Sequence, residues 1–169
     1  MKRALAFLYF ILAGCAGVPP KPHQVPNPQP LPVALDRDFS FRKTIQYYLE
    51  PFPKQIAKLD ESVGFERSYR VFGAITALDQ RDRFGNYYTF FWRAQHRADV
   101  TVRLEYRQEK THAFTQAREV FQSQARGTNR TVFAIIGDDY ANDGRVIAWR
   151  ASLIVDGRVV AINKSYLWE

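Results

Sequence analysis

A stretch of alternating apolar and polar residues most constrains the fold of this chain. Val100, Val102, Leu104 and Tyr106 alternate with Thr101, Arg103, Glu105 and Arg107. Successive side chains of a β-strand point to opposite faces, so this pattern predicts a strand with one buried face. Residues 87–94 precede it as an aromatic strand, in which Tyr88, Phe90 and Trp92 are expected to point one way. Two neighbouring strands are therefore expected to contribute one face each to a core.

The pair Asp156-Gly157 predicts a β-hairpin near the end of the chain. Apolar residues alternate before it at Ile147, Trp149, Ala151, Leu153 and Val155, and a second apolar run, Arg158 to Trp168, follows it. Asp-Gly suits a two-residue hairpin turn, because both central residues need a positive φ angle. The expected register places Val155 opposite Arg158, Leu153 opposite Val160 and Ile147 opposite Tyr166.

Three further segments are interpreted as strands: 69–79 with Gly73 at a bulge, 113–124 as an edge strand, and 131–136. Residues 82–86 are expected to form a turn. The segment 36–68 fits two patterns. Phe39, Phe41, Ile45, Tyr47 and Leu49 alternate like a strand broken at Lys43, whereas Phe41, Ile45 and Tyr48 would share a helical face. Pro53 favours the start of a short helix over 53–56.

This series of short strands predicts an all-β fold. The expected architecture is an antiparallel, immunoglobulin-like β-sandwich of about seven strands in a domain spanning residues 36–169. The pattern resembles immunoglobulin or fibronectin type III domains, with Trp92 and Trp149 as core aromatics. It lacks the cysteine pair of antibody domains. A small β-barrel is the alternative.

Composition is consistent with a folded body that needs no disulfide. Apolar residues make up 46% and aromatics 15% of the chain, which is enough to fill a core. The single cysteine, Cys15, excludes an internal disulfide. The net charge of +7 is scattered along the expected strands, so it does not favour nucleic-acid binding, and anionic lipid, lipopolysaccharide phosphate or a glycan is the sharper alternative to a solvated surface.

The pattern of the first fifteen residues is typical of a secretory leader. Met1-Lys2-Arg3 is a charged start, residues 4–12 are apolar but too short to span a bilayer, and Leu12-Ala13-Gly14-Cys15 follows. This resembles a bacterial lipoprotein signal with its lipobox. The resemblance implies a signal peptide over 1–14, cleavage before Cys15, and acyl chains on Cys15 that anchor the protein stably in a membrane. Ala16, in place of Asp, favours the outer membrane facing the periplasm if the source is Gram-negative.

A proline-rich linker over residues 15–35 joins the lipidated cysteine to the body. Seven of the nine prolines lie between Val18 and Val33. Fixed φ angles and missing N–H groups favour an extended polyproline II stalk over helix or strand pairing. The sixteen residues 18–33 would then span roughly 50 Å. The expected role is a tether that holds the body away from the membrane, with a PxxP-type ligand as the alternative.

The sequence offers no convincing catalytic residues and predicts no cofactor. The only thiol is assigned to lipid attachment, and no Gly-x-Ser-x-Gly motif occurs. His96 and His112 flank the strand at 98–108, so they are not expected to share a metal. Asp138, Asp139 and Asp143 form a weak calcium candidate, with an ordinary turn as the simpler interpretation. Asp79, Asp82 and Asn86 form a thinner version of the same pattern.

Surplus aromatic residues provide the candidate binding surface. Tyr87, Phe91, Tyr47, Tyr48, Tyr166 and Trp168 cannot all point inward if their strands alternate. An exposed row of Tyr87, Phe91 and Trp168 beside Arg93 and Arg103 would suit a glycan or an envelope protein; packing in the core or under residues 36–68 is the alternative. The predicted function is a non-enzymatic binding or accessory module anchored through Cys15. The alternatives are an envelope hydrolase that uses loop carboxylates and a structural spacer at the membrane surface.

Overall fold

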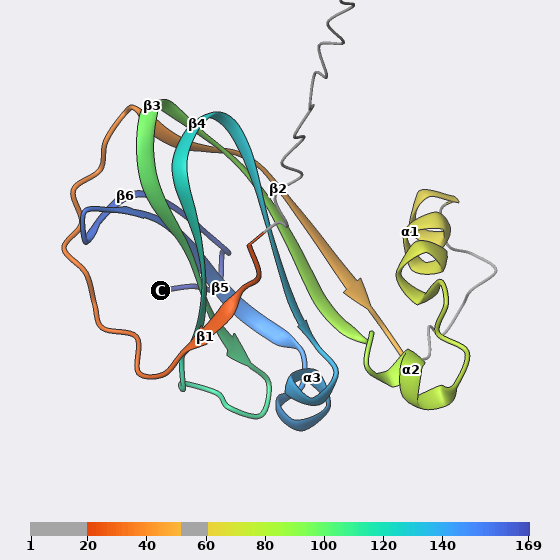
Figure 1. Ribbon diagram of the computed structural model, residues 1–169. Coiled ribbons are helices and arrows are strands. Elements are labelled where there is room, and N and C mark those ends of the chain that lie inside the picture. Colours follow the sequence, from red (N-terminus) through yellow and green to blue (C-terminus); the bar gives the residue numbers. More distant parts are fainter. Residues whose placement is uncertain (1–19, 52–60) are drawn as a thin grey trace, which may run out of the picture.

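The computed structural model describes residues 20–51 and 61–169 as an all-β fold with three short helices (Figure 1). Its elements are β1 (His23–Val25), β2 (Phe39–Leu49), α1 (Glu61–Val71), α2 (Ala77–Arg81), β3 (Gly85–Gln108), β4 (Gln116–Ile136), α3 (Asp138–Asp143), β5 (Val146–Val155) and β6 (Arg158–Lys164). All paired strands are antiparallel, which confirms the predicted class. The predictions for the leader, Cys15, Ala16 and the helix at 53–56 lie outside the described residues. No helix in the described ranges is long and apolar enough to cross a membrane.

Two long strands fold one six-stranded sheet into a sandwich-like body. β4 pairs with β3 along almost its whole length, so β2 and β5 share the other edge of β3. β2 pairs with the first half, from Leu49↔Gly85 to Phe39↔Ala94, and β5 pairs with the second half. β6 then pairs with β5 and approaches β2, where Asn163 Nδ2 donates to Thr44 Oγ1 over 2.7 Å. The two halves of the sheet therefore face each other across one core.

The bend in the long strands coincides with irregular pairing. The β3–β4 register shifts between Ala94 and Ala98 and again before Val100. On β4, Gln124 has a φ angle of 50°, in the left-handed region, and its backbone N–H donates to Asp99 Oδ1 over 2.7 Å. Extra residues in one strand of a pair bend it and increase its twist. The bulges therefore turn what the sequence suggested as separate strands into continuous, folded ones.

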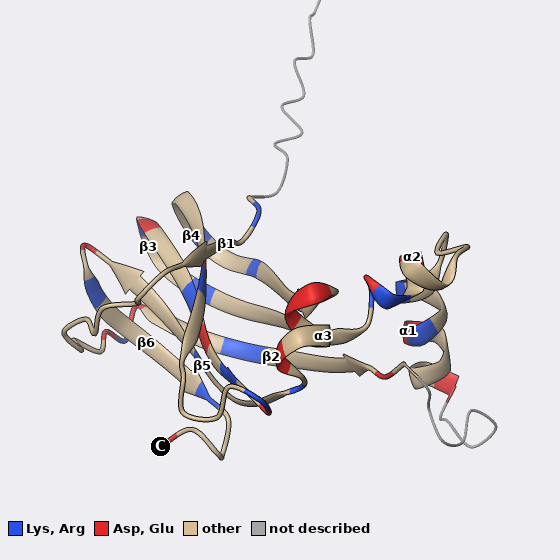
Figure 2. Ribbon diagram, turned by 90° about the horizontal axis from the view of Figure 1, so that it is seen from below, with Lys and Arg blue, Asp and Glu red and all other residues tan. Residues whose placement is uncertain are grey.

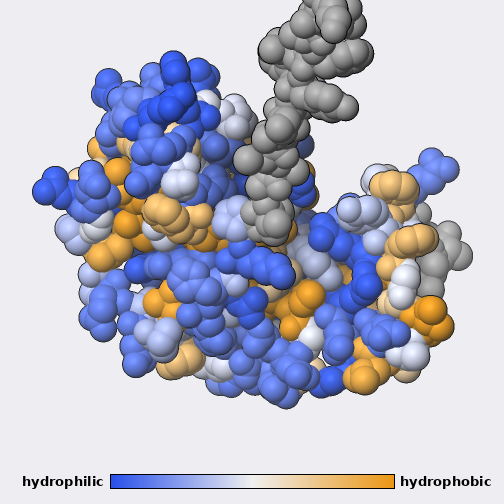
Figure 3. All heavy atoms as spheres, in the orientation of Figure 1, coloured by the Kyte–Doolittle hydropathy of each residue, from blue (hydrophilic) through white to orange (hydrophobic). Residues whose placement is uncertain are grey.

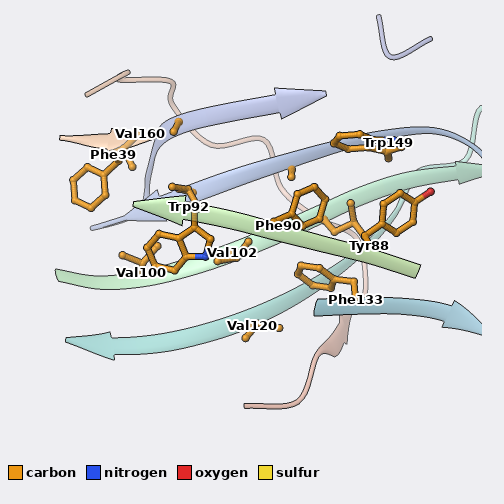
Figure 4. Close-up of a cluster of buried hydrophobic side chains, with 14 of the residues drawn as sticks. Phe39, Tyr88, Phe90, Trp92, Val100, Val102, Val120, Phe133, Trp149 and Val160 are labelled. Atoms are coloured by element: carbon orange, nitrogen blue, oxygen red, sulfur yellow. The ribbon is translucent and has the colours of Figure 1, made fainter. Parts of the chain in front are cut away.

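The core consists of the inward-facing residues of both halves of the sheet (Figure 4). Tyr88, Phe90 and Trp92 point to the same side and are buried, as predicted. Val100, Val102, Leu104 and Tyr106 are fully buried after the bend, which confirms the second alternating pattern. Phe133 of β4 packs edge-on against Phe90, with ring centroids 6.1 Å apart. Aromatic pairs at such distances contribute beyond the area that they bury.

The strand predicted at 69–79 is wrong, because α1 ends at Val71 and α2 covers Ala77–Arg81. Gly73, with a φ angle of 80°, follows the end of α1 and not a strand bulge. Thr76 and Asp79 then form a reciprocal capping box that starts α2. This hydrogen-bonding pattern fixes a helix start where apolar content alone suggested a strand. With residues 113–124 and 131–136 also joined into β4, the separate strands that were predicted reduce to six in the sheet.

The Asp156-Gly157 hairpin is confirmed, but its register changes after two residue pairs. Val155 pairs with Arg158 as expected, whereas Leu153 pairs with Ala161 and not with Val160. A register shift between Leu153 and Ile154 causes this difference. β6 ends at Lys164, so the predicted pairing of Ile147 with Tyr166 is not formed. The lead-in strand is also settled: Phe39–Leu49 is β2, with an irregularity between Phe41 and Lys43.

The proline-rich linker is not a free stalk within the described residues. His23, Gln24 and Val25 pair with Glu119, Arg118 and Ala117 of β4. These three residues lie between Pro22 and Pro26, so all three keep the backbone N–H that a ladder requires. Further along, Val33 bridges to Val159, and the Ala34 backbone N–H donates to the Val159 carbonyl over 2.9 Å. The prediction that this whole segment avoids strand pairing is therefore wrong.

Candidate functional site

Tyr87, the first predicted binding residue, is buried beneath the α1–α2 lobe, which we define as residues 61–84. Its hydroxyl donates to the Arg83 carbonyl over 2.6 Å. The guanidinium of Arg70 lies 4.1 Å from the centre of its ring. Burial raises the pKa of Tyr87. Tyr87 therefore fixes the lobe to the sheet and offers no free surface to a ligand.

Arg103 and Trp168 are also covered, on the outer face of the second half of the sheet. Arg103 pairs with Glu119 at 2.6 Å and donates to the Gln29 carbonyl of the linker over 3.0 Å. Trp168 is buried, and the guanidinium of Arg107 lies 4.8 Å from its ring centroid. The linker and the C-terminal residues therefore occupy the surface that an exposed aromatic row would require.

Phe91 and Arg93 lie apart from the other three predicted binding residues. Both occupy the outer face of β3 just before the bend, with Phe91 half-buried and Arg93 exposed. Their respective pairing partners on β4 are Arg130 and Thr128. The five residues predicted as one binding surface are thus distributed over three places, and the structure does not bring them together.

The three weak calcium candidates on α3 each have a different partner. Asp138 pairs with Arg81 at 2.7 Å, Asp139 pairs with Arg118, and Asp143 accepts a hydrogen bond from Gln116 Nε2 over 3.0 Å. Among the described residues, no three His, Cys, Asp or Glu side chains group as metal ligands would. These contacts tie α3 to its neighbours, so we do not propose a calcium site there. Figure 2 shows α3 as an acidic segment beside strands that carry scattered Lys and Arg.

The second acidic pattern, Asp79, Asp82 and Asn86, is divided between the two caps of α2 and the start of β3. Hydrogen bonds from the Thr76 backbone and side chain, in that order, lower the pKa of Asp79 in the capping box. Asn86 lies on β3, where its Oδ1 accepts from the Val146 backbone N–H over 3.0 Å. The histidines are equally dispersed: His96 contacts Asp38 at 3.3 Å, while His112 lies in the turn after β3.

An aromatic pocket at one open end of the folded sheet is the best candidate site. It has a volume of about 360 Å³ and is lined by β2, the start of β3, the start of β5 and the C-terminal residues. Its lining residues are Gln46, Tyr47, Tyr48, Asn86, Tyr88, Arg145, Val146, Ile147, Trp149, Ser165, Tyr166 and Leu167. Small-molecule sites of this size combine aromatic walls with a few polar groups.

The floor of the aromatic pocket belongs to the core. Tyr88 and Trp149 have ring centroids 5.7 Å apart, and the Trp149 indole N–H donates to Gln46 Oε1 over 3.1 Å. The hydroxyl of Tyr88 has no hydrogen-bond partner in the described part of the chain, and it lies at the edge of the cluster in Figure 4. Burial raises the pKa of Tyr88 far above its ordinary value, so the hydroxyl remains a neutral donor. The floor therefore presents a rigid aromatic surface with an unused polar group.

The rim of the pocket supplies a cation. The Arg145 guanidinium lies 4.5 Å from the Tyr48 ring centroid, and Arg145 is exposed with no carboxylate partner among the described residues. Tyr48 is held in place because its hydroxyl shares a 2.6 Å hydrogen bond with the Tyr140 hydroxyl. Burial, followed by that hydrogen bond, raises the pKa of Tyr48. Tyr166 is 99% exposed at the mouth, so its ring is free to contact a ligand.

The lining suits binding, because its charged and polar groups are one arginine, amides and hydroxyls. None of the lining residues named above is Asp, Glu, His, Lys or Cys. Ser165 has no base beside it, and its Oγ accepts a hydrogen bond from the Trp149 backbone N–H over 3.0 Å. A nucleophilic serine needs such a base to be activated. The pocket can hold and orient a ligand, and we derive no reaction from it.

Comparisons with protein-family models, curated proteins and solved structures found no match to this chain. The sequence had signalled part of the pocket, since Tyr47, Tyr48 and Tyr166 were among the surplus aromatics. Arg145 was missed, because nothing in a single exposed arginine indicates that a tyrosine ring from β2 lies beside it.

Proposed function

We propose that this protein is a lipid-anchored lipoprotein of the bacterial cell envelope that acts as a non-enzymatic binding module for an anionic glycan. The observation that carries the binding proposal is the aromatic pocket, where Arg145, with no carboxylate partner among the described residues, lies over the Tyr48 ring and no carboxylate, imidazole, amine or thiol lines the walls. The anchor is proposed from the leader, whose residues 12–15 match a lipobox. A neighbouring envelope protein is the alternative ligand.

The chemistry of the pocket favours a glycan with a negative substituent. Tyrosine and tryptophan present an apolar ring together with a polar tip, which matches the apolar and hydroxyl faces of a sugar. The Arg145 guanidinium presents planar donors that fit a carboxylate or phosphate. Gln46, Asn86 and the Tyr88 hydroxyl add polar groups within the same walls. Envelope glycans that carry carboxylates or phosphates combine all of these features.

The anchor is tested by replacing the cysteine. Cys15→Ser is expected to abolish acylation, because a hydroxyl is too weak a nucleophile to form the thioether. Metabolic labelling with a palmitate analogue, followed by membrane fractionation, measures both lipid attachment and its consequence. Ala16→Ser leaves the thiol in place and serves as the matched control. Full labelling of the Cys15→Ser protein would contradict the proposed anchor.

The pocket is tested by removing its cation. Arg145→Gln in the full chain is expected to weaken binding of an anionic glycan by roughly 10- to 100-fold, because hydrogen bonds to a charged group are worth about 1.5–3 kcal/mol. Calorimetry with muropeptides and with phosphorylated core oligosaccharide measures the loss. A neutral gluco-oligosaccharide should bind the two proteins equally.

Arg158→Gln is the control variant, because Arg158 is also exposed but lies beside the hairpin turn and outside the pocket. It should bind like the unmodified protein. Equal affinity of the Arg145→Gln and Arg158→Gln proteins for the charged glycans would contradict the assignment of the pocket. Loss of binding in both would indicate a diffuse electrostatic effect and would also contradict it.

A further inference from the structure

Helix α1 packs against the sheet with its polar face. Arg70 stacks on Tyr87, and Arg67 donates to the Glu50 carbonyl at the end of β2 over 2.7 Å. Arg70 also pairs with Glu66 on the same face at 2.6 Å. A surface helix of a globular protein normally buries its apolar stripe and exposes its charged one. In α1 the charged side chains Arg67 and Arg70 make the contacts with the sheet instead.

The apolar stripe of the lobe is left uncovered. Phe65 and Tyr69 lie four residues apart and share one face of α1, Phe72 follows directly after the helix, and all three are exposed. Ile75 and Leu78 continue this surface, with Phe72 at 83% and Ile75 at 90% exposure. No residue of α1 or α2 is buried. Figure 3 shows apolar atoms over this lobe, at the end of the molecule away from the β5–β6 hairpin.

The charges of the lobe cancel. Residues 61–84 contain four arginines and four acidic residues. Several are already engaged within the fold: Arg70 with Glu66, Arg81 with Asp138, and Arg83 with the Arg70 carbonyl. Attraction to a charged partner therefore contributes little to binding at this surface. Burial of its apolar area would supply most of the binding free energy.

The short chain between Cys15 and β1 favours the lipid bilayer as the surface that this lobe meets. Eight residue steps separate Cys15 from His23, where β1 pairs with β4. Fully extended, eight residues span at most roughly 29 Å. If Cys15 carries lipid, as proposed above, the pairing of β1 holds the body within that distance of the bilayer. The long free stalk expected from the prolines would have imposed no such limit.

We propose that the exposed apolar face of the α1–α2 lobe docks on the same lipid bilayer that holds Cys15. This inference rests on the proposed lipidation. Helices that lie in a membrane interface bury Phe and Leu side chains at the boundary of the acyl chains, and stable attachment combines such a face with a covalent lipid. A bilayer is favoured over a protein partner because the tether brings it within reach in every copy of the protein. The docked lobe fixes how the glycan pocket is oriented above the membrane.

The single cysteine makes a direct test possible. In the lipidated protein a second cysteine would be the only free thiol, so Phe72→Cys can be labelled with an environment-sensitive fluorophore. The labelled full chain is reconstituted into vesicles of phosphatidylethanolamine and phosphatidylglycerol that contain nitroxide-labelled lipid. We expect the label at position 72 to lose most of its emission to the nitroxide. Because the lobe is neutral, this quenching should persist at high salt.

Arg158→Cys, labelled in the same way, is the matched control, since the β5–β6 hairpin lies at the far end of the molecule in Figures 1 and 2. Its label should remain largely unquenched. Ile75→Cys repeats the test at a second position of the lobe in case the first variant is perturbed.

Three results would overturn the docking. If the vesicles retain the protein but neither lobe position is quenched more than position 158, the anchor stands and the docking fails. If adding envelope proteins alone shields the lobe positions, the face belongs to a protein partner. If the vesicles do not retain the protein because Cys15 carries no lipid, the proposed anchor and the docking both fail.

Discussion

Trp92→Ala is expected to lower the free energy of unfolding by about 3–5 kcal/mol, the usual cost of truncating a large aromatic residue in a core. Trp92 is fully buried near the bend of β3, among side chains from both halves of the sheet (Figure 4). Its indole N–H donates to Thr131 Oγ1 over 2.9 Å, so alanine also removes a buried hydrogen bond. Urea denaturation followed by fluorescence and circular dichroism measures the loss.

Phe121→Ala is the control for this core prediction. Phe121 is also a strand aromatic, on β4, but it is 52% exposed. Its removal should cost well under half as much, because about half of the side chain stays in water on folding and alanine there removes no buried hydrogen bond. Similar losses for the two variants would mean that the two halves of the sheet do not enclose one tight core around Trp92.

Trp92 also shows which parts of the fold the sequence could predict. Period-two alternation predicts which side chains share a face of a strand. This prediction is confirmed in both halves of β3, where the alternating apolar residues are buried. The same pattern carries no information on whether two such runs are separate strands or one strand with a bulge. The bulge after Ala94 depends on pairing with β4, whose residues lie about thirty positions further along the chain.

The sequence predicted neither helix α1 nor the strand pairing of the linker, for related reasons. The residues around Tyr69 are apolar enough to suggest a strand, and only the capping box at Thr76 and the helical spacing of Phe65, Tyr69 and Phe72 indicate otherwise. In the linker, composition predicted the behaviour of the prolines but not of the short proline-free run at His23. A three-residue pairing depends on the edge of β4 that it meets, which composition does not describe.

The candidate site was predictable only in its ingredients. An excess of aromatics over the available inward positions was visible in the sequence, and Tyr48 and Tyr166 belong to that excess. Their meeting with Arg145 is a product of topology, because β2, β5 and the C-terminal residues come together only when the sheet folds over. For the same reason Tyr87 is covered by the lobe, and Trp168 is buried with its ring beside the guanidinium groups of Arg107 and Arg150.

Gly85→Ala is expected to destabilise the protein by at least about 2 kcal/mol, because the native conformation is closed to a side chain in two ways. Gly85 begins β3 with a φ angle of 135°, which residues with a Cβ rarely adopt. A Cβ built there would lie 2.2 Å from the Ile135 carbonyl oxygen, which belongs to the backbone of β4. Chemical denaturation measures the loss, and hydrogen exchange locates it.

Gly64→Ala separates this steric effect from the general cost of replacing glycine. Gly64 lies within α1, and a Cβ at that position meets nothing within 4 Å. In a helix interior alanine is favoured over glycine by about 1 kcal/mol, so this variant should be neutral or slightly more stable. Equal stability of the two variants would mean that Ile135 can move away from β3 at no cost. The Gly85→Ala protein should instead lose protection first at Ile135, Ile136 and α3, since relieving the clash requires β4 to shift where it leads into that helix.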